Sequence, residues 1–406
     1  MNWIARGDTI IFDSEYNAEP DIALISNYKK LIFSNFKLNN RLFEYYEKIF
    51  EFESDKDFCY KNDAYGKFNQ EVSKKLPRSL THLEFGYAFN KDVSKLPRSL
   101  THLFFGICFN KNVSKLPRSL THLFFGYNFN QNVSKLPKTL THLEFCGFFN
   151  HDVSNLPTSL TYLSLGYMFD NDISNLSPNI THLILSYFFN QDISILPINL
   201  TYLKFIQYGN IDVSKLPYGI THLIFSTRFN KDVSDLPSKL THLTFGFHFN
   251  QDVSNLPSFL THLTFGYEFN QDISKLPLTI THLTLGYKFN QQFNIPSNIQ
   301  YLKLDCNNQY IINSLPNSVT ELKLDKCFDL EMNNLPTSIK KLAINPHSKY
   351  NKDLNSLPDF IEELQLNYDY EKRVLNIPSN LKKIKCSEKY PYINDFEMCI
   401  VETYFD

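Results

Sequence analysis

The chain has 406 residues, with 40 basic and 42 acidic side chains and a formal net charge of −2. This near balance gives no global reason to expect nucleic acid or an anionic membrane as a partner. The 37 Phe and 24 Tyr residues exclude an intrinsically disordered chain, because such chains are poor in aromatic residues.

The start of the chain and its hydropathy bear on its location. Residues 1–8 hold no apolar stretch, and no run in the chain approaches the roughly 18 apolar residues of a membrane span. We therefore expect no secretory signal, no membrane span and no membrane partner. The seven cysteines are scattered without a CxxC pair, which favours free thiols in a reducing compartment. The predicted location is cytoplasmic.

Three short apolar stretches stand near the start of the chain, at residues 9–12, 30–33 and 49–52. They are similar to the strand of the repeat that follows, and Tyr16-Asn17 stands where that repeat has Phe-Asn. An end turn of an array must cover the exposed core of its neighbour and is therefore atypical. We predict that residues 1–67 are degenerate repeats that form an N-terminal cap.

A repeat of 20 residues then dominates the sequence and predicts an array. The unit T-H-L-x-F-G-Y-x-F-N-x-D-V-S-x-L-P-x-S-L recurs from Thr81 to Asn290 without slippage. Five weaker units follow, with their strand residues at Leu302, Leu322, Leu342, Leu364 and Ile384. Residues 68–386 are predicted to form the solenoid, and residues 387–406 a C-terminal cap.

One unit, residues 81–100, shows how the repeat folds. In Thr-His-Leu-x-Phe, Leu83 and Phe85 point to one side of a strand and His82 and Glu84 to the other. Twenty residues are too few for a strand and a full helix, so the return path must be extended or a single 3₁₀ turn. The sequence predicts a leucine-rich-repeat-like solenoid with one short strand per turn and a curved parallel sheet. The predicted core of this unit is Leu83, Phe85, Phe89, Val93, Leu96 and Leu100.

An Asn follows the second Phe of each regular unit. A buried amide needs hydrogen-bond partners, and at the strand spacing of about 4.8 Å it can reach backbone groups of the adjacent turn. We expect a structural ladder, interrupted by Asp170. Its members are Asn90, Asn110, Asn130, Asn150, Asn190, Asn210, Asn230, Asn250, Asn270 and Asn290.

The repeat, with its Phe-Asn pair and Leu-Pro anchor, resembles the FNIP repeat, a leucine-rich-repeat relative seen in social amoebae and in large DNA viruses of amoebae. The unit here is shorter than usual for that family. The resemblance implies a right-handed solenoid with a parallel sheet, and in some members an N-terminal F-box that recruits a ubiquitin ligase. An F-box is helical and opens with a Leu-Pro-x-Glu-type start. Residues 1–66 resemble strands instead, with one helical stretch near residues 40–48, so an F-box is not evident.

Histidine recurs at one position of the exposed face of the sheet, with Tyr162 and Tyr202 replacing two members. Stacked histidines could chelate a cation or make binding pH-dependent. A structural zinc site needs four convergent ligands, whereas a straight column offers two, so a stacked structural ladder is the alternative. We expect no metal and no cofactor. The column is His82, His102, His122, His142, His182, His222, His242, His262 and His282.

Another position on the same face varies freely, which is typical of a tuned binding surface. Phe104 and Phe124 are predicted to expose two rings next to His102 and His122. Glu84 and Glu144 flank them in the row. The alternative is neutral drift on a tolerant surface. The leading hypothesis is a scaffold that binds an unknown protein partner through this face.

Basic residues recur on both sides of the Leu-Pro anchor in the first repeats. Stacked like charges repel, which favours an acidic protein, a phosphate or a nucleic-acid backbone as partner, although nucleic acid is the less expected. The alternative is a solvated face. These basic columns are Lys75, Lys95, Lys115 and Lys135, with Arg78, Arg98, Arg118 and Lys138.

No phosphate-binding loop, GxSxG or HExxH motif stands in the sequence. The Asp and Ser of the Asp-Val/Ile-Ser segment recur in most regular units, and a catalytic group does not need so many copies. We therefore predict that the chain is not an enzyme. Beside the scaffold, the remaining hypotheses are a substrate adaptor of an SCF-type ubiquitin ligase and binding of nucleic acid or an acidic partner through the basic columns.

Overall fold

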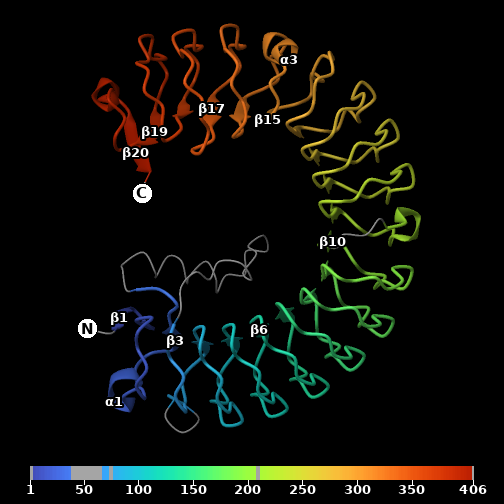
Figure 1. The fold of residues 1–406 in the computed structure, drawn as a ribbon, viewed down its shortest axis with the longest axis vertical. Helices are drawn as coiled ribbons and strands as arrows, with labels where there is room; N and C mark the ends of the chain where they lie inside the picture. The colour runs from blue at the N-terminus through green and yellow to red at the C-terminus, as the bar shows by residue number, and fades with distance from the viewer. Residues whose placement is uncertain (1–2, 38–65, 73–75, 207–210, 405–406) are drawn as a thin grey trace. The chain divides into compact units, whose positions relative to one another are not determined.

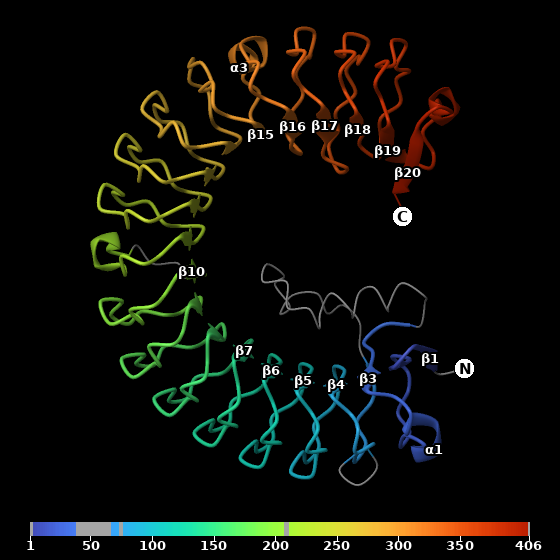
Figure 2. The ribbon, with the colours of Figure 1, turned by 180° about the vertical axis from the view of Figure 1, so that it is seen from behind.

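The computed structural model describes residues 3–37, 66–72, 76–206 and 211–404. It has two compact units, Met1–Gln207 and Tyr208–Asp406. Each unit is a succession of turns with one short strand per turn (Figures 1 and 2). The predicted fold class is confirmed: the chain forms a parallel-strand, leucine-rich-repeat-like solenoid with about 20 residues per turn and little helix.

The first unit begins with an antiparallel hairpin that the sequence did not predict. Gly7 has φ of 59° in its two-residue turn, a conformation that glycine adopts without strain. Every later strand pair described in this unit is parallel. Its strands are β1 (Trp3–Arg6), β2 (Thr9–Phe12), β3 (Lys30–Phe33), β4 (His82–Glu84), β5 (His102–Phe104), β6 (His122–Phe125), β7 (His142–Phe145), β8 (Tyr162–Ser164), β9 (His182–Leu185) and β10 (Tyr202–Phe205).

Two of the three apolar stretches near the start, residues 9–12 and 30–33, form the strands β2 and β3. β2 and β3 pair in parallel, and β3 pairs directly with β4 although 48 residues separate them in sequence. A one-turn helix, α1 (Ile22–Ile25), is capped by the Asp21 carboxylate, which accepts a hydrogen bond from Ala23 N at 2.9 Å. The predicted strand at residues 49–52 and the helical stretch near 40–48 lie outside the described residues.

The second unit contains the weaker repeats, and each predicted strand residue from Leu302 to Ile384 lies in a strand. α3 (Gln309–Asn313) replaces part of one return path, and the 3₁₀ turns η2 (Val213–Lys215) and η3 (Ile393–Phe396) occur elsewhere. The strands are β11 (His222–Ile224), β12 (His242–Thr244), β13 (His262–Thr264), β14 (His282–Leu285), β15 (Tyr301–Leu304), β16 (Glu321–Leu324), β17 (Lys341–Ile344), β18 (Glu363–Gln365), β19 (Lys383–Ser387) and β20 (Ile400–Tyr404).

The tail after residue 387 adds one more strand, since β20 pairs in parallel with β19. Ile400 and Val401 of this strand are exposed. The assignment of residues 1–67 and 387–406 as caps stays a prediction.

Stacked phenyl rings run through the core beside columns of leucine, isoleucine and valine. Within one turn the centroids of Phe85 and Phe89 are 3.6 Å apart, and both rings are buried. All six predicted core residues of the unit 81–100 are buried, so that prediction is confirmed. Removing such a side chain from water is worth roughly 1.5–3 kcal/mol before ordering entropy, and stacking makes the same contribution available to each turn.

The distances between equivalent rings show how far neighbouring turns diverge. Centroids of equivalent rings are 4.1 Å apart for His82 and His102, and 5.7 Å apart for Phe85 and Phe105. The distance grows to 6.1 Å for Phe89 and Phe109. The turns are therefore closest at the solvent-facing side of the strands and fan apart away from it. Within each unit the strands line the concave side (Figure 1).

Glycine after the strand is explained by close backbone approach. A Cβ at Gly106 would lie 2.2 Å from the carbonyl oxygen of Gly86 in the preceding turn. A larger side chain at Gly106 would therefore press against the preceding turn. Glycine favours close stacking here, although Cys146, Ser186 and Ser226 occupy the equivalent position in other units.

The cysteines differ from expectation at one position. Cys108, Cys306, Cys327, Cys386 and Cys399 are free, whereas Cys146 is disulfide-bonded. The expectation of free thiols throughout was wrong because pairing depends on the distance between Cα atoms in the fold, which spacing along the chain does not reveal. No helix in the described ranges has the length and apolar character needed to cross a membrane.

Candidate functional site

The asparagines form a turn-to-turn hydrogen-bonded ladder. Each side-chain oxygen accepts a hydrogen bond from the backbone N–H of the equivalent residue in the next turn, at 2.9–3.1 Å. The ladder begins at Asn17, whose Oδ1 accepts from Asn69 N at 2.9 Å, as its place in the decayed repeat indicated. Satisfying a backbone donor in every turn is a structural role.

Asp170 does not interrupt this ladder, contrary to expectation. Its N–H donates to Asn150 Oδ1 at 3.0 Å, and its Oδ1 accepts from Asn190 N at 2.9 Å. The reason is that only the acceptor oxygen is used, and a carboxylate supplies one as well as an amide does. Asn210 lies outside the described residues.

The histidine column is a stack of parallel rings. Neighbouring imidazole centroids lie 4.0–4.2 Å apart, with planes within 18° of each other. In all nine members Nδ1 lies 2.9 Å from Oγ1 of the preceding Thr. Tyr162 and Tyr202 continue the stack at wider spacing, with centroid distances of 5.5–6.3 Å to neighbouring histidines.

The geometry of this column favours the structural alternative over a metal site. Nitrogen lone pairs lie in the ring plane, so two parallel stacked rings direct them side by side rather than toward one point. Among the described residues, no group of three or more His, Cys, Asp or Glu side chains is placed to hold a metal ion. Burial, with repulsion from neighbouring histidines, lowers the pKa of His102 to about 4 and that of His122 to about 3.

The freely varying row on the same face is not exposed where we predicted. Phe104 and Phe124 are only 3% and 5% exposed, with ring centroids 6.3 Å apart, and Glu84 is buried beside them. The parallel register places each residue directly beside its equivalents in adjacent strands. Strand alternation indicates which side of the sheet a residue faces, but not whether other atoms cover its side chain. Glu144, His102 and His122 keep partial exposure.

Glu84 is electrostatically unusual within that row. Burial raises the pKa of its carboxyl to about 8. Its Oε2 has no hydrogen-bond partner in the described structure. Burial therefore favours the protonated form of this carboxyl. A binding role for Phe104, Phe124 and their neighbours stays a prediction, but the exposure on which it depended is absent for the two rings.

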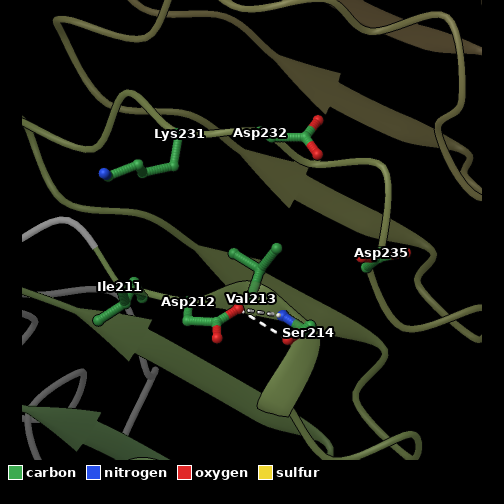
Figure 3. A pocket seen from close by; sticks show the side chains of 7 residues that line it. All are labelled: Ile211, Asp212, Val213, Ser214, Lys231, Asp232 and Asp235. Carbon is green, nitrogen blue, oxygen red and sulfur yellow. Dashed lines mark hydrogen bonds between the residues drawn. The ribbon is translucent and has the colours of Figure 1, made fainter.

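The recurring Asp-x-Ser segment forms a local turn. Asp212 Oδ1 accepts from Ser214 N at 3.1 Å and from Ser214 Oγ at 2.7 Å, and the other regular units repeat this pattern (Figure 3). These bonds lower the pKa of the Asp212 carboxyl. Asp212 and Ser214 line a pocket of about 310 Å³, and Asp232 and Asp235 of the next turn line it as well. Because the pattern recurs in many copies and caps its own backbone, we assign it a structural role.

The basic columns lie on the return path, where each described member is exposed. Lys95, Arg98, Lys115 and Arg118 line a groove of about 910 Å³. None of the seven described members forms an ion pair with another described residue. Lys75 lies outside the described residues. The structure thus brings together four of the eight predicted basic residues in one groove.

The FNIP repeat model matches six stretches, which together hold more than half of the residues. The chain belongs to the FNIP repeat family. The matched stretches are residues 68–108, 109–148, 210–248, 249–288, 289–327 and 307–347. No curated protein matches this FNIP repeat protein.

Three solved structures are similar to this FNIP repeat protein. CroV588 from a giant virus, described as a novel circular LRR protein structure, is 27% identical with a TM-score of 0.63, covering 99% of this chain and 70% of that one. The functional domain of InlJ from Listeria monocytogenes is 17% identical, with a TM-score of 0.39 over 63% of this chain and 64% of that one. YopM from Yersinia enterocolitica is 15% identical, with a TM-score of 0.36 over 81% and 88%.

The FNIP repeat has a second freely varying position that the sequence analysis missed. It is the residue between the Gly-Tyr pair and the Phe-Asn pair, here called the loop column. The backbone N–H of a loop-column residue donates to a carbonyl oxygen of the preceding turn, as Phe148 N does to Tyr127 O at 2.8 Å. The signal for this position in the sequence is that its residue changes from unit to unit. The described members are Ala88, Cys108, Asn128, Phe148, Met168, Phe188, Arg228, His248, Glu268 and Lys288.

Three successive members of the loop column form an apolar patch in the first unit. Phe148, Met168 and Phe188 are 43%, 37% and 49% exposed. Phe188 packs edge-on against Tyr167 and Tyr187, with centroids 5.3 and 4.9 Å apart. In the second unit the same column is polar: Glu268 forms ion pairs with His248 at 3.0 Å and Lys288 at 3.1 Å. The apolar character is thus local, and not a demand of the fold.

Proposed function

We propose that this FNIP repeat protein is a scaffold that binds a protein partner through the apolar patch of Phe148, Met168 and Phe188. The observation that carries the proposal is their exposure on three consecutive turns of a hydrogen-bonded framework. A large apolar residue exposed once is ordinary, whereas a contiguous apolar patch in a polar rim is typical of a binding surface.

Rigidity of the patch supports the same proposal. Tyr167 and Tyr187 stack with centroids 4.5 Å apart and hold the Phe188 ring edge-on. An aromatic anchor that is already ordered loses little conformational entropy on binding, and such anchors contribute much of the energy of protein interfaces. The patch replaces Phe104 and Phe124 as the preferred site because those two rings are buried.

The fold is consistent with a scaffold, since stacked repeats present extended surfaces for partners. The leucine-rich-repeat-like neighbours agree with this general role. The ubiquitin-ligase adaptor hypothesis and the absence of enzymatic activity stay predictions. A scaffold of this kind requires no cofactor.

Affinity capture with a matched control tests the proposal. The protein is immobilised as wild type, as Phe148→Ser with Phe188→Ser, and as Ile195→Ser with Ile198→Ser. The control pair removes two apolar side chains that are 39% and 61% exposed in the same unit but outside the loop column. We expect a protein that the wild type and the control retain and the patch variant loses. Identical sets from all three, or nothing retained by the wild type, would contradict the proposal.

A further inference from the structure

The return path of the first unit has a local charge imbalance that the whole chain does not have. Residues 92–144 contain seven cations and two acids, Asp92 and Glu144 at the ends, whereas the equivalent stretch of the second unit, residues 212–264, contains four cations and four acids. The cations are Lys95, Arg98, Lys111, Lys115, Arg118, Lys135 and Lys138. Both stretches build the same turns, so the imbalance is not required by the fold.

The scarcity of acids arises at the Asp-x-Ser turn. Two successive copies in this stretch have Asn112 and Asn132 in place of Asp. The amide oxygens still cap the turn, accepting from Ser114 N and Ser134 N at 2.9 Å. The structural role is therefore retained while two negative charges next to the basic columns are removed. This change strengthens the positive potential without altering the backbone.

The groove lies within this stretch. Lys95, Arg98, Lys115 and Arg118 line it from two adjacent turns, and all four are exposed. No described acidic side chain forms an ion pair with them. Four like charges facing one groove repel one another, and an anionic ligand would relieve that repulsion.

We propose that this groove binds an extended acidic peptide whose carboxylates alternate along the chain. The rings that begin the return path, Phe89 and Phe109, are 6.1 Å apart, and Phe109 and Phe129 are also 6.1 Å apart. In an extended peptide, side chains on one side recur every two residues, about 6.6 Å. Alternate carboxylates therefore meet successive turns, each of which offers one Lys and one Arg or Lys. Arg binds carboxylate with two parallel hydrogen bonds.

The lining favours a peptide over a single-stranded nucleic acid. Its non-basic residues are serine, leucine and proline, with no aromatic ring on which a base could stack. Stacking on aromatic side chains supplies much of the affinity of single-strand binding sites. This proposal concerns a surface separate from the apolar patch and does not depend on the proposed function.

The experiment uses purified full-length protein and three fluorescent probes of equal charge, followed by anisotropy. The probes are a peptide of alternating Glu and Ser, a peptide with the same residues in two blocks, and a single-stranded oligonucleotide. The variant Lys95→Ala with Lys115→Ala removes two groove charges. Its control, Lys215→Ala with Lys275→Ala, removes two exposed charges from the same repeat position in the second unit.

We expect the alternating peptide to bind the wild type and the control equally, and the groove variant about tenfold more weakly. Binding should weaken as salt is raised. The proposal is overturned if the alternating peptide does not bind, if the block peptide binds as tightly, or if both double variants lose the same affinity. Tighter binding of the oligonucleotide would overturn it in favour of nucleic acid. All four substituted lysines are exposed, so unchanged circular dichroism is expected throughout.

Discussion

The Thr101 hydroxyl oxygen lies 2.9 Å from His102 Nδ1. The same hydroxyl donates its hydrogen to the carbonyl oxygen of Thr81 at 3.1 Å. The carbonyl oxygen of Thr81 also accepts from Thr101 N and His102 N, at 2.9 and 3.0 Å. The Thr hydroxyl thus joins the imidazole of its own turn to the backbone of the preceding turn. The Thr and His columns act together, and each turn is tied to the one before it.

Substituting Thr121 by Val tests this coupling. Thr121 Oγ1 contacts His122 Nδ1 at 2.9 Å and donates to Thr101 O at 3.2 Å. Valine has nearly the same shape but no hydroxyl, so His122 Nδ1 loses this hydrogen-bond partner. We expect the free energy of unfolding to fall by about 1–2 kcal/mol in urea titrations. Thr121→Ser keeps the hydroxyl and should lose less than half as much. Equal losses in the two variants would refute the coupling.

Acid should destabilise the histidine column. Burial lowers the folded-state pKa of His82, His102 and His242 to about 4, from 6.5 for the unperturbed side chain. Between these values the unfolded chain binds protons that the folded chain does not. The stabilising contribution is complete above pH 6.5 and is lost as the pH falls through 4. The midpoint of urea unfolding should therefore decrease steadily from pH 7 to pH 4.

A matched variant separates this effect from general acid denaturation. Tyr162 and Tyr202 occupy the same column, so tyrosine is accepted by the stack. His122→Tyr removes the ring whose pKa is lowest, at about 3, and should make the unfolding midpoint less dependent on pH between 6.5 and 4. An unchanged slope would show that the column does not control acid stability.

Glu84 should make the protein less stable as the pH rises, opposite to the effect of the histidine column. Its folded-state pKa is raised from 4.5 to about 8 by burial, so the folded chain keeps a proton that the unfolded chain has released. The stabilising contribution is complete below pH 4.5 and is lost as the pH rises through 8. Relative to wild type, Glu84→Gln should gain at least about 2 kcal/mol in unfolding free energy between pH 4.5 and pH 8.5. A difference between the two proteins that does not change with pH would contradict the buried acid.

The sequence predicted the features that depend on periodicity. Leu83 and Phe85 alternate with His82 and Glu84, and that alternation alone assigned the strand and its buried side. It could not predict that Phe104 is buried, because alternation indicates which side of the sheet a residue faces and not what covers it. The apolar patch around Phe188 lies in the loop after the strand, outside this alternation, although the same alignment of repeats displays its variation.

The asparagine ladder offers a test in which the chain itself supplies the control. Asn250 Oδ1 accepts from Asn270 N at 2.9 Å and from Gln271 Nε2 at 3.0 Å. Asn250→Ala leaves both donors without this acceptor, and we expect a loss of about 1–3 kcal/mol in unfolding free energy. Asn250→Asp should retain most of the stability, because Asp170 already accepts from Asn190 N and Gln191 Nε2 at the same place in its own turn. Equal losses for Ala and Asp would mean that the amide, rather than its acceptor oxygen, holds the turns together.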